Sequence, residues 1–88
     1  MRWKIEVKPT AEKYYLRLGK QNRKRIKGAL TALRNAEDPF SMKNVRPLTG
    51  KLQGDYRVRV GKWRILFSPE REKKTIHGYA ILPRGDAY

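Results

Sequence analysis

The chain has 88 residues, which suffices for one small domain over residues 1–88 with a single layer of helices packed on a single sheet. It has no cysteine, which excludes disulfides and thiolate metal sites and fits a cytoplasmic protein, and no apolar run approaches the roughly 18 residues of a membrane span. The net charge of +14, from 22 lysines and arginines against 8 acids, predicts a polyanionic partner: nucleic acid first, an acidic protein second and an anionic membrane third.

The first elements are predicted to be a strand and two helices. Residues 3–7 alternate between apolar and charged side chains, which is typical of a half-buried strand. Thr10 is the expected N-cap of a helix over residues 11–18, which Gly19 ends. A second helix is expected over residues 21–36, where the apolar side chains follow helical spacing.

This second helix has a basic face. No acid occurs between residues 13 and 36, although eight lysines and arginines do. Arg23, Lys24 and Lys27 are therefore the expected contacts to nucleic-acid phosphates. The alternatives are an ordinary solvated helix face and the binding of an acidic amphipathic helix of a partner protein.

A β-hairpin is the best-defined element of the sequence. Residues 39–54 are predicted to form a loop, because they contain two prolines and two glycines. Two alternating runs follow over residues 56–67, separated by Gly61-Lys62, and this pattern indicates a hairpin with a type II′ turn. A two-residue turn sets the apolar side chains opposite each other on the core face: Tyr56 with Phe67, Val58 with Ile65, and Val60 with Trp63.

The other face of the hairpin is basic. Arg59 is expected directly opposite Arg64, with Arg57 one step further along the strand. Like charges opposite each other weaken a sheet, so three arginines on one face indicate a site for an anion. The alternative is a solvated strand face.

The end of the chain completes a sheet. Residues 68–74 form a predicted polar turn, residues 75–82 a last strand, and residues 83–88 an irregular tail. The order β-α-α-β-β-β places the protein in the α+β class, with two helices packed on one face of a small, mostly antiparallel sheet. His77, the only histidine, is expected to share a strand face with Tyr79 and Ile81 and to be structural rather than catalytic.

At this point a family resemblance emerges. The run PLTGKLQGDYRVRVGKWRILF over residues 47–67 resembles the RelE/ParE superfamily of toxins, in which an L-x-G stretch leads into Y-R-x-R-x-G-x-[YW]-R-[IV]. The resemblance implies a toxin that enters the ribosomal A site, cuts mRNA between codon bases and so inhibits translation. It also implies a co-transcribed acidic antitoxin that wraps around the toxin in a hetero-oligomer, and no cofactor or metal. ParE-type members share the fold but act on DNA gyrase, and that is the alternative function.

The resemblance also implies roles for single residues. Arg57 and Arg59 fall where many RelE toxins have lysines that position the substrate and transfer protons, and Arg64 falls on the arginine that contacts the phosphate. Arg84 matches the basic residue near the leaving group, and Tyr88 the final aromatic that stacks on an mRNA base. ParE-type chains commonly lack part of this set, which favours the RelE type.

The sequence leaves the general base open. Arginine keeps its proton at neutral pH, so Arg57 and Arg59 are suited to stabilise a phosphorane but not to deprotonate a ribose 2′-OH. Lys51 and Lys62, which are also expected to contact nucleic acid, are candidates, together with a ribosomal group. A chain without any base is an inactive RNA-binding module, which is the third hypothesis.

Overall fold

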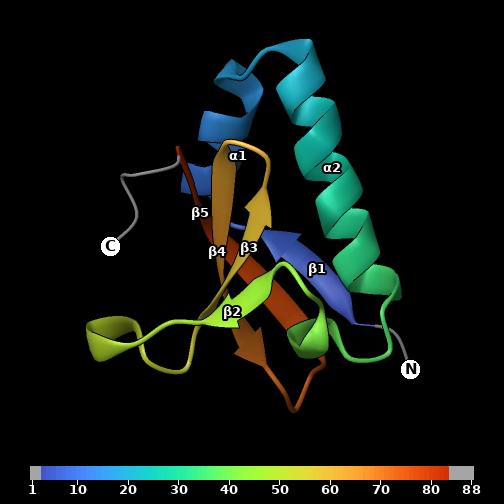
Figure 1. Ribbon diagram of the computed structural model, residues 1–88, viewed down its shortest axis with the longest axis vertical. Coiled ribbons are helices and arrows are strands. Elements are labelled where there is room, and N and C mark those ends of the chain that lie inside the picture. The colour runs from blue at the N-terminus through green and yellow to red at the C-terminus, as the bar shows by residue number, and fades with distance from the viewer. Residues whose placement is uncertain (1–2, 84–88) are drawn as a thin grey trace.

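The computed structural model describes residues 3–83, which form two layers (Figure 1). In chain order the elements are β1 (Lys4–Val7), α1 (Pro9–Arg17), α2 (Lys20–Asn35), η1 (Pro39–Ser41), β2 (Val45–Pro47), η2 (Gly50–Leu52), β3 (Tyr56–Val60), β4 (Trp63–Glu70) and β5 (Thr75–Pro83). The strands form one sheet in the order β1-β5-β4-β3-β2. Only the β1–β5 pair is parallel, so the predicted α+β fold with a mostly antiparallel sheet is confirmed.

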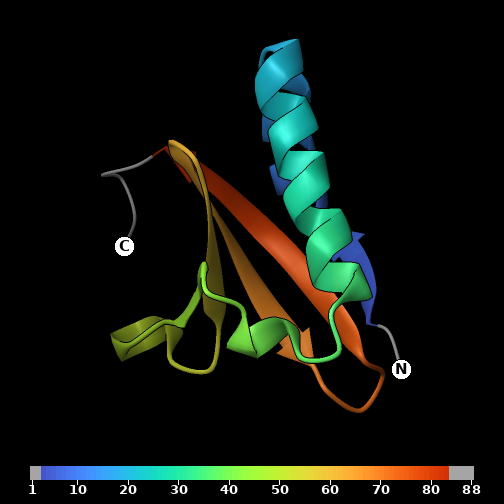
Figure 2. The same ribbon diagram turned by 45° about the vertical axis from the view of Figure 1, so that its right-hand side comes forward.

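Both helices lie on the same side of the sheet, and the loop that carries η2 projects on the other side (Figure 2). Ile26 and Leu33 of α2 are fully buried against the strands, where they meet Val58, Ile65 and Phe67. The helices therefore cover the face predicted to be apolar. Burial of side chains of this size stabilises the fold by about 1.5–3 kcal/mol each.

An aromatic cluster closes the end of the core near η1. The Phe40 ring meets Trp3 edge-on at 5.1 Å between centroids, and its centroid lies 4.7 Å from that of Tyr56. Tyr56 in turn stacks on Phe67 at 5.9 Å. The guanidinium of Arg71 lies 4.7 Å above the Phe40 ring, a cation–π contact that covers the outside of the cluster.

The structure corrects the predicted start of the first helix. Helix α1 begins at Pro9 with Lys8 as its N-cap, and no side chain caps it. Thr10 therefore lies inside the helix, and its prediction as the N-cap is wrong. The reason is that proline at the first helical position already has the φ angle of a helix and needs no N–H partner.

The strands also extend further than the sequence predicted. The expected loop over residues 39–54 contains the short edge strand β2, whose proline is tolerated there because an edge needs no donor on its outer side. Strand β4 continues through Pro69 to Glu70, beyond the last residue paired with β3. Pro69 thus meets only β5, so its missing N–H leaves no gap in the ladder. None of the helices within residues 3–83 is long and apolar enough to cross a membrane.

Candidate nucleic-acid interface

The hairpin of β3 and β4 forms with the predicted register. Val60 pairs with Trp63, Val58 with Ile65 and Tyr56 with Phe67. Gly61 has a φ of 58°, while Lys62 keeps a negative φ, which is the pattern of a type II′ turn. A side chain on Gly61 is disfavoured by this angle, and so this glycine fixes the register that decides which side chains face the solvent.

The face of the sheet away from the helices gathers arginines from three strands. Arg59 is the register partner of Arg64, as predicted, and Arg57 is the register partner of Arg46 on β2. Arg59 and Arg46 are exposed, whereas Arg57 and Arg64 are half-buried. We call these four side chains the arginine face.

Arg46 was missed by sequence reasoning. It lies in a strand of three residues that carries no alternating pattern, within a segment rich in proline and glycine. Its role became visible only through the β2–β3 register, which no local signal in the sequence specifies.

No carboxylate of the described residues forms an ion pair with the arginine face. Within residues 3–83 the ion pairs join Lys73 to Glu70 and His77 to Glu6 and Glu70, and none of them includes an arginine. In the same part of the chain the Nε atom of Arg64 is buried and has no hydrogen-bond partner. Two like-charged cross-strand pairs without counter-charges are costly to the fold, and a bound anion removes that cost.

A hollow of about 340 Å³ opens beside β3 on this face. Its lining is formed by Lys43, Asn44, Arg46, Arg57 and Arg59. Arg64 is not part of this lining and belongs to the adjoining β4 side of the arginine face. Among the described residues the hollow thus has four cations and no acid in its lining, which suits a phosphate group or a nucleic-acid backbone.

The predicted lysines lie at the ends of this region. Lys51 is exposed on η2, which precedes β3, and Lys62 is exposed in the turn that follows β3. They therefore lie beyond opposite ends of the strand that carries Arg57 and Arg59. The structure does not single out either lysine as a general base.

The basic residues predicted on α2 lie in the other layer. Arg23 is half-buried, and Lys24 and Lys27 are exposed on the helix that covers the opposite face of the sheet. Lys24 lines a hollow with Lys20 and Arg25. The arginine face and the basic helix are thus separated by the sheet, and the structure does not bring them into one site.

Tyr79 tethers the loop before β3 to the sheet. A β-bulge opposite Leu66 and Phe67 leaves Tyr79 without a register partner, and its hydroxyl donates a hydrogen bond of 2.8 Å to Asp55 Oδ2. Burial and, next, this hydrogen bond to a carboxylate raise the pKa of Tyr79 well above its usual value. The contact was not predicted, because a bulge leaves no signal in this sequence.

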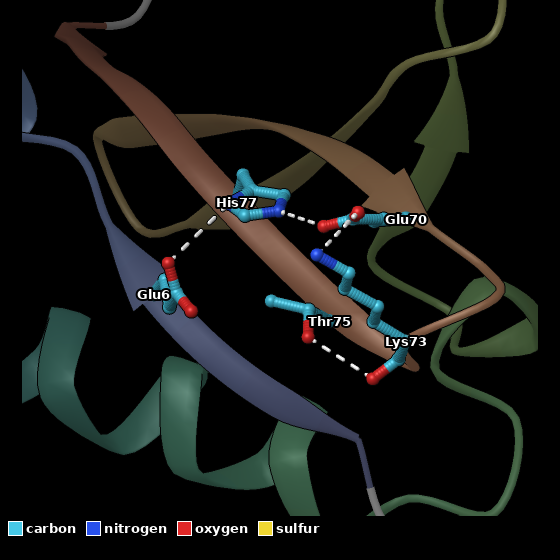
Figure 3. Close-up of polar contacts among 5 residues, drawn as sticks. All are labelled: Glu6, Glu70, Lys73, Thr75 and His77. Carbon is cyan, nitrogen blue, oxygen red and sulfur yellow. Dashed lines mark hydrogen bonds and ion pairs between the residues drawn. The ribbon is translucent and has the colours of Figure 1, made fainter.

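His77 is held between two carboxylates on the outer face of the sheet (Figure 3). Its Nε2 lies 2.8 Å from Glu70 Oε1, and its Nδ1 lies 3.8 Å from Glu6 Oε1. The hydrogen bond with His77 lowers the pKa of Glu70, and nearby Lys73 adds to the effect. These contacts support the structural interpretation of His77.

The predicted strand face of His77 is wrong in one respect. Ile81 is buried in the core beneath the helices, whereas His77 lies on the opposite face with Glu6 and Glu70. The bulge at Tyr79 adds one residue between the two positions and so reverses the alternation.

The end of β5 approaches the hairpin. Leu82 pairs with Arg64, and Pro83 pairs with Trp63. Arg84 and Tyr88, which were predicted to complete the site, lie outside the described residues.

Comparison with known proteins gives a consistent picture. Residues 5–88 match the family model of the ParE toxin of the type II toxin–antitoxin system, parDE. Among solved structures, the RelE–RelB complex of Pyrococcus horikoshii matches with 26% identity and a TM-score of 0.80, covering 99% of this chain and 100% of the other. No curated protein matches the chain.

More distant structures share the fold. RelBE2 of Mycobacterium tuberculosis matches with 20% identity and a TM-score of 0.70, over 96% of this chain and 100% of the other. The isolated RelE toxin of Escherichia coli matches with 15% identity and a TM-score of 0.76, covering 97% of this chain and 87% of the other.

Proposed function

The chain belongs to the RelE/ParE superfamily of type II toxin–antitoxin toxins, and on this premise we propose that it is a ribosome-dependent mRNA endonuclease. The family resemblance seen in residues 47–67 is confirmed by the match over residues 5–88. The observation that carries the proposed activity is the arginine face, where Arg59 opposes Arg64 without a carboxylate partner among the described residues.

The reaction proposed for this face is RNA cleavage in which the nucleophile is a 2′-oxygen of the RNA and the protein stabilises the transition state. The ribose 2′-oxygen attacks the adjacent phosphorus and loses its proton, the bond from phosphorus to the 5′-oxygen breaks, and that oxygen gains a proton. The products are a 2′,3′-cyclic phosphate and a 5′-hydroxyl. Negative charge builds on the phosphorane oxygens, and guanidinium groups fixed on paired strands are positioned to stabilise it without reorganisation.

The residues predicted on the hairpin, beside it and in the tail each have a part in this proposal. Arg57, Arg59 and Arg64 hold the scissile phosphate, Arg84 supports the leaving 5′-oxygen, and Tyr88 stacks on a base. The arginines keep their protons, so the base is Lys51, Lys62 or a ribosomal group. Dependence on the ribosome follows if the substrate has to be held in a shape that this small exposed face cannot impose by itself.

The proposed partner in the inactive state is an acidic antitoxin, in a hetero-oligomer in the cytoplasm. An apolar groove of about 500 Å³ lies between the helices and the edge of the sheet, lined by Val7, Tyr15, Leu16, Leu30 and Ile81 together with Glu12 and Lys27. Leu16 is 61% exposed there. An amphipathic acidic helix fits both this groove and the net charge of +14.

Inhibition of DNA gyrase is the second candidate function, and the ParE description of the matching family model favours it. One experiment separates the two. Purified protein is added to ribosomes programmed with mRNA, the message is analysed by primer extension, and gyrase supercoiling is assayed in parallel with the same preparation.

The expected result is cleavage at the A-site codon, little cleavage of naked RNA and no effect on gyrase. Arg64→Ala should abolish cleavage, whereas Arg34→Ala, which removes an exposed arginine from the end of α2, should not. Intact mRNA together with inhibited gyrase would reverse the assignment. Ribosome binding without cleavage would instead identify the inactive RNA-binding module.

A further inference from the structure

Two cations beyond the predicted site lie at one side of the arginine face: Arg46, which belongs to that face, and the neighbouring Lys43. Lys43 and Arg46 line the hollow of about 340 Å³ on the side away from β4, next to Arg57 and Arg59. Arg46 is the register partner of Arg57, just as Arg64 is the register partner of Arg59. The face therefore consists of two adjacent like-charged pairs, each able to receive an anion.

The guanidinium of Arg46 is oriented before any ligand arrives. Its Nη1 donates hydrogen bonds to the backbone carbonyls of Lys43, at 2.9 Å, and Val45, at 3.1 Å. A guanidinium has five N–H donors, so Nη2 and Nε remain for a ligand. Part of the conformational entropy that binding would otherwise cost has therefore already been lost in folding.

The floor of the hollow is also fixed. The side-chain Nδ2 of Asn44 donates a hydrogen bond to the backbone carbonyl of Arg59 at 3.1 Å. The backbone carbonyl of Asn44 accepts a hydrogen bond from the Arg59 N–H at 2.9 Å. These contacts fix the backbone of Arg59 relative to the segment that carries Lys43 and Arg46.

The spacing fits a strand of nucleic acid. Residues two apart on a strand lie about 7 Å apart, so the Arg46–Arg57 pair and the Arg59–Arg64 pair are offset enough for two successive phosphates of one backbone, with Arg57 between them. The part of the lining that falls within residues 3–83 contains no acid and no apolar side chain, and a peptide helix requires apolar anchors at helical spacing. Such anchors are found instead in the groove that contains Leu16, in the helical layer.

We propose that Lys43 and Arg46 form a second phosphate site, which holds the backbone phosphate next to the one held by Arg57, Arg59 and Arg64 on a single RNA strand. The identity of that strand as mRNA rests on the proposed function, whereas the site itself does not. Its residues bind and align the strand, and they take no part in the bond that is cut.

The test is the salt dependence of RNA binding. A fluorescent six-nucleotide single-stranded RNA is titrated with the protein at several NaCl concentrations, and the binding constant is plotted logarithmically against salt. Each phosphate neutralised on a single strand contributes a slope of about 0.7, and Lys43 and Arg46 share one phosphate, so Lys43→Gln with Arg46→Gln should lower the slope by about 0.7. The matched control, Lys13→Gln with Arg34→Gln, removes two exposed charges from the helices and should leave the slope unchanged.

Three results would overturn the second site. One is an equal fall in slope for both double variants, which would indicate a general charge effect. Another is binding of inorganic phosphate as tight as that of the RNA at equal ionic strength, which would indicate an isolated anion hole. The third is a double variant, Lys43→Gln with Arg46→Gln, that no longer binds a glutamate decapeptide but still binds RNA as the wild type does. That result would indicate an acidic protein as the partner.

The second site and the proposed function fail separately. If the wild type cuts ribosome-bound mRNA but the slope does not fall, the second site is wrong and the function stands. If the slope falls by the expected amount but the wild type cuts no mRNA, the protein has the phosphate site and lacks the activity.

Discussion

Removing one arginine from the arginine face should stabilise the protein. Arg59 is exposed, directly opposes Arg64 and has no carboxylate partner among residues 3–83. A directly opposed cross-strand pair contributes roughly 0.2–1 kcal/mol, and like charges make that contribution unfavourable. Arg59→Gln should therefore raise the free energy of unfolding by about 0.5 kcal/mol, or Tm by about 2–4 °C in a domain of this size.

Urea and thermal unfolding followed by circular dichroism measure this change. The Debye screening length falls from about 30 Å at 0.01 M salt to about 3 Å at 1 M. The gain in unfolding free energy of Arg59→Gln should therefore be largest at low salt and nearly vanish at about 1 M NaCl. The control is Arg34→Gln, which lowers the net charge equally but removes a cation from the last turn of α2. There a cation stabilises by about 0.3–1 kcal/mol, so this control should lose stability.

The two variants change the net charge equally, yet Arg59→Gln should raise the free energy of unfolding and Arg34→Gln should lower it. If Arg59→Gln were less stable than the wild type at low salt, the two arginines would not repel each other, and the argument for an anion site would fail. An equal gain in Arg34→Gln would refute it as well, because the effect would then belong to the net charge.

Three further changes test other parts of the structure. Tyr79→Phe removes the hydrogen bond to Asp55 and should cost about 1 kcal/mol in urea unfolding; an unchanged midpoint would mean that the loop is not tethered there. The pKa of Glu70 is lowered from its usual value near 4.5 by the hydrogen bond with His77, so its stabilising effect is complete above that value and lost as the pH falls through the lower folded pKa. Glu70→Gln should accordingly flatten the Tm profile below about pH 4.5, whereas parallel profiles would show that the pair does not affect stability. Gly61→Ala forces alanine to a φ of 58° and should cost about 1–2 kcal/mol, and a neutral result would contradict the turn.

The turn and the register of the hairpin could be predicted from the sequence because their determinants are local. Strict alternation defines two faces, and a glycine in the first turn position fixes the loop length. These two facts determine that Arg59 faces Arg64, and the structure agrees. The second helix was predicted to within one residue at each end for the same reason, since its apolar stripe is continuous.

The parts that were missed depend on contacts between distant segments. Strand β2 has only three residues and is defined by its pairing with β3, so Arg46 could not be assigned to the site beforehand. The bulge at Tyr79 depends on how β5 meets β4, and it moved His77 to the face opposite Ile81. The structure places Arg57, Arg59 and Arg64 on one face of the sheet together with Arg46, with Lys43 beside them, and it places the basic residues of α2 in the other layer.

The most direct test of the proposed function examines the bond that is cut. Programmed ribosomes carry either an all-ribose mRNA or the same mRNA with a single 2′-deoxynucleotide on the 5′ side of the cut. The wild type should cleave the first message and leave a 2′,3′-cyclic phosphate, and it should leave the second intact at that position, with Arg64→Ala inactive on both. Cleavage of the deoxy-substituted message at the same position would show that the 2′-oxygen is not the nucleophile and would contradict the role proposed for the arginine face.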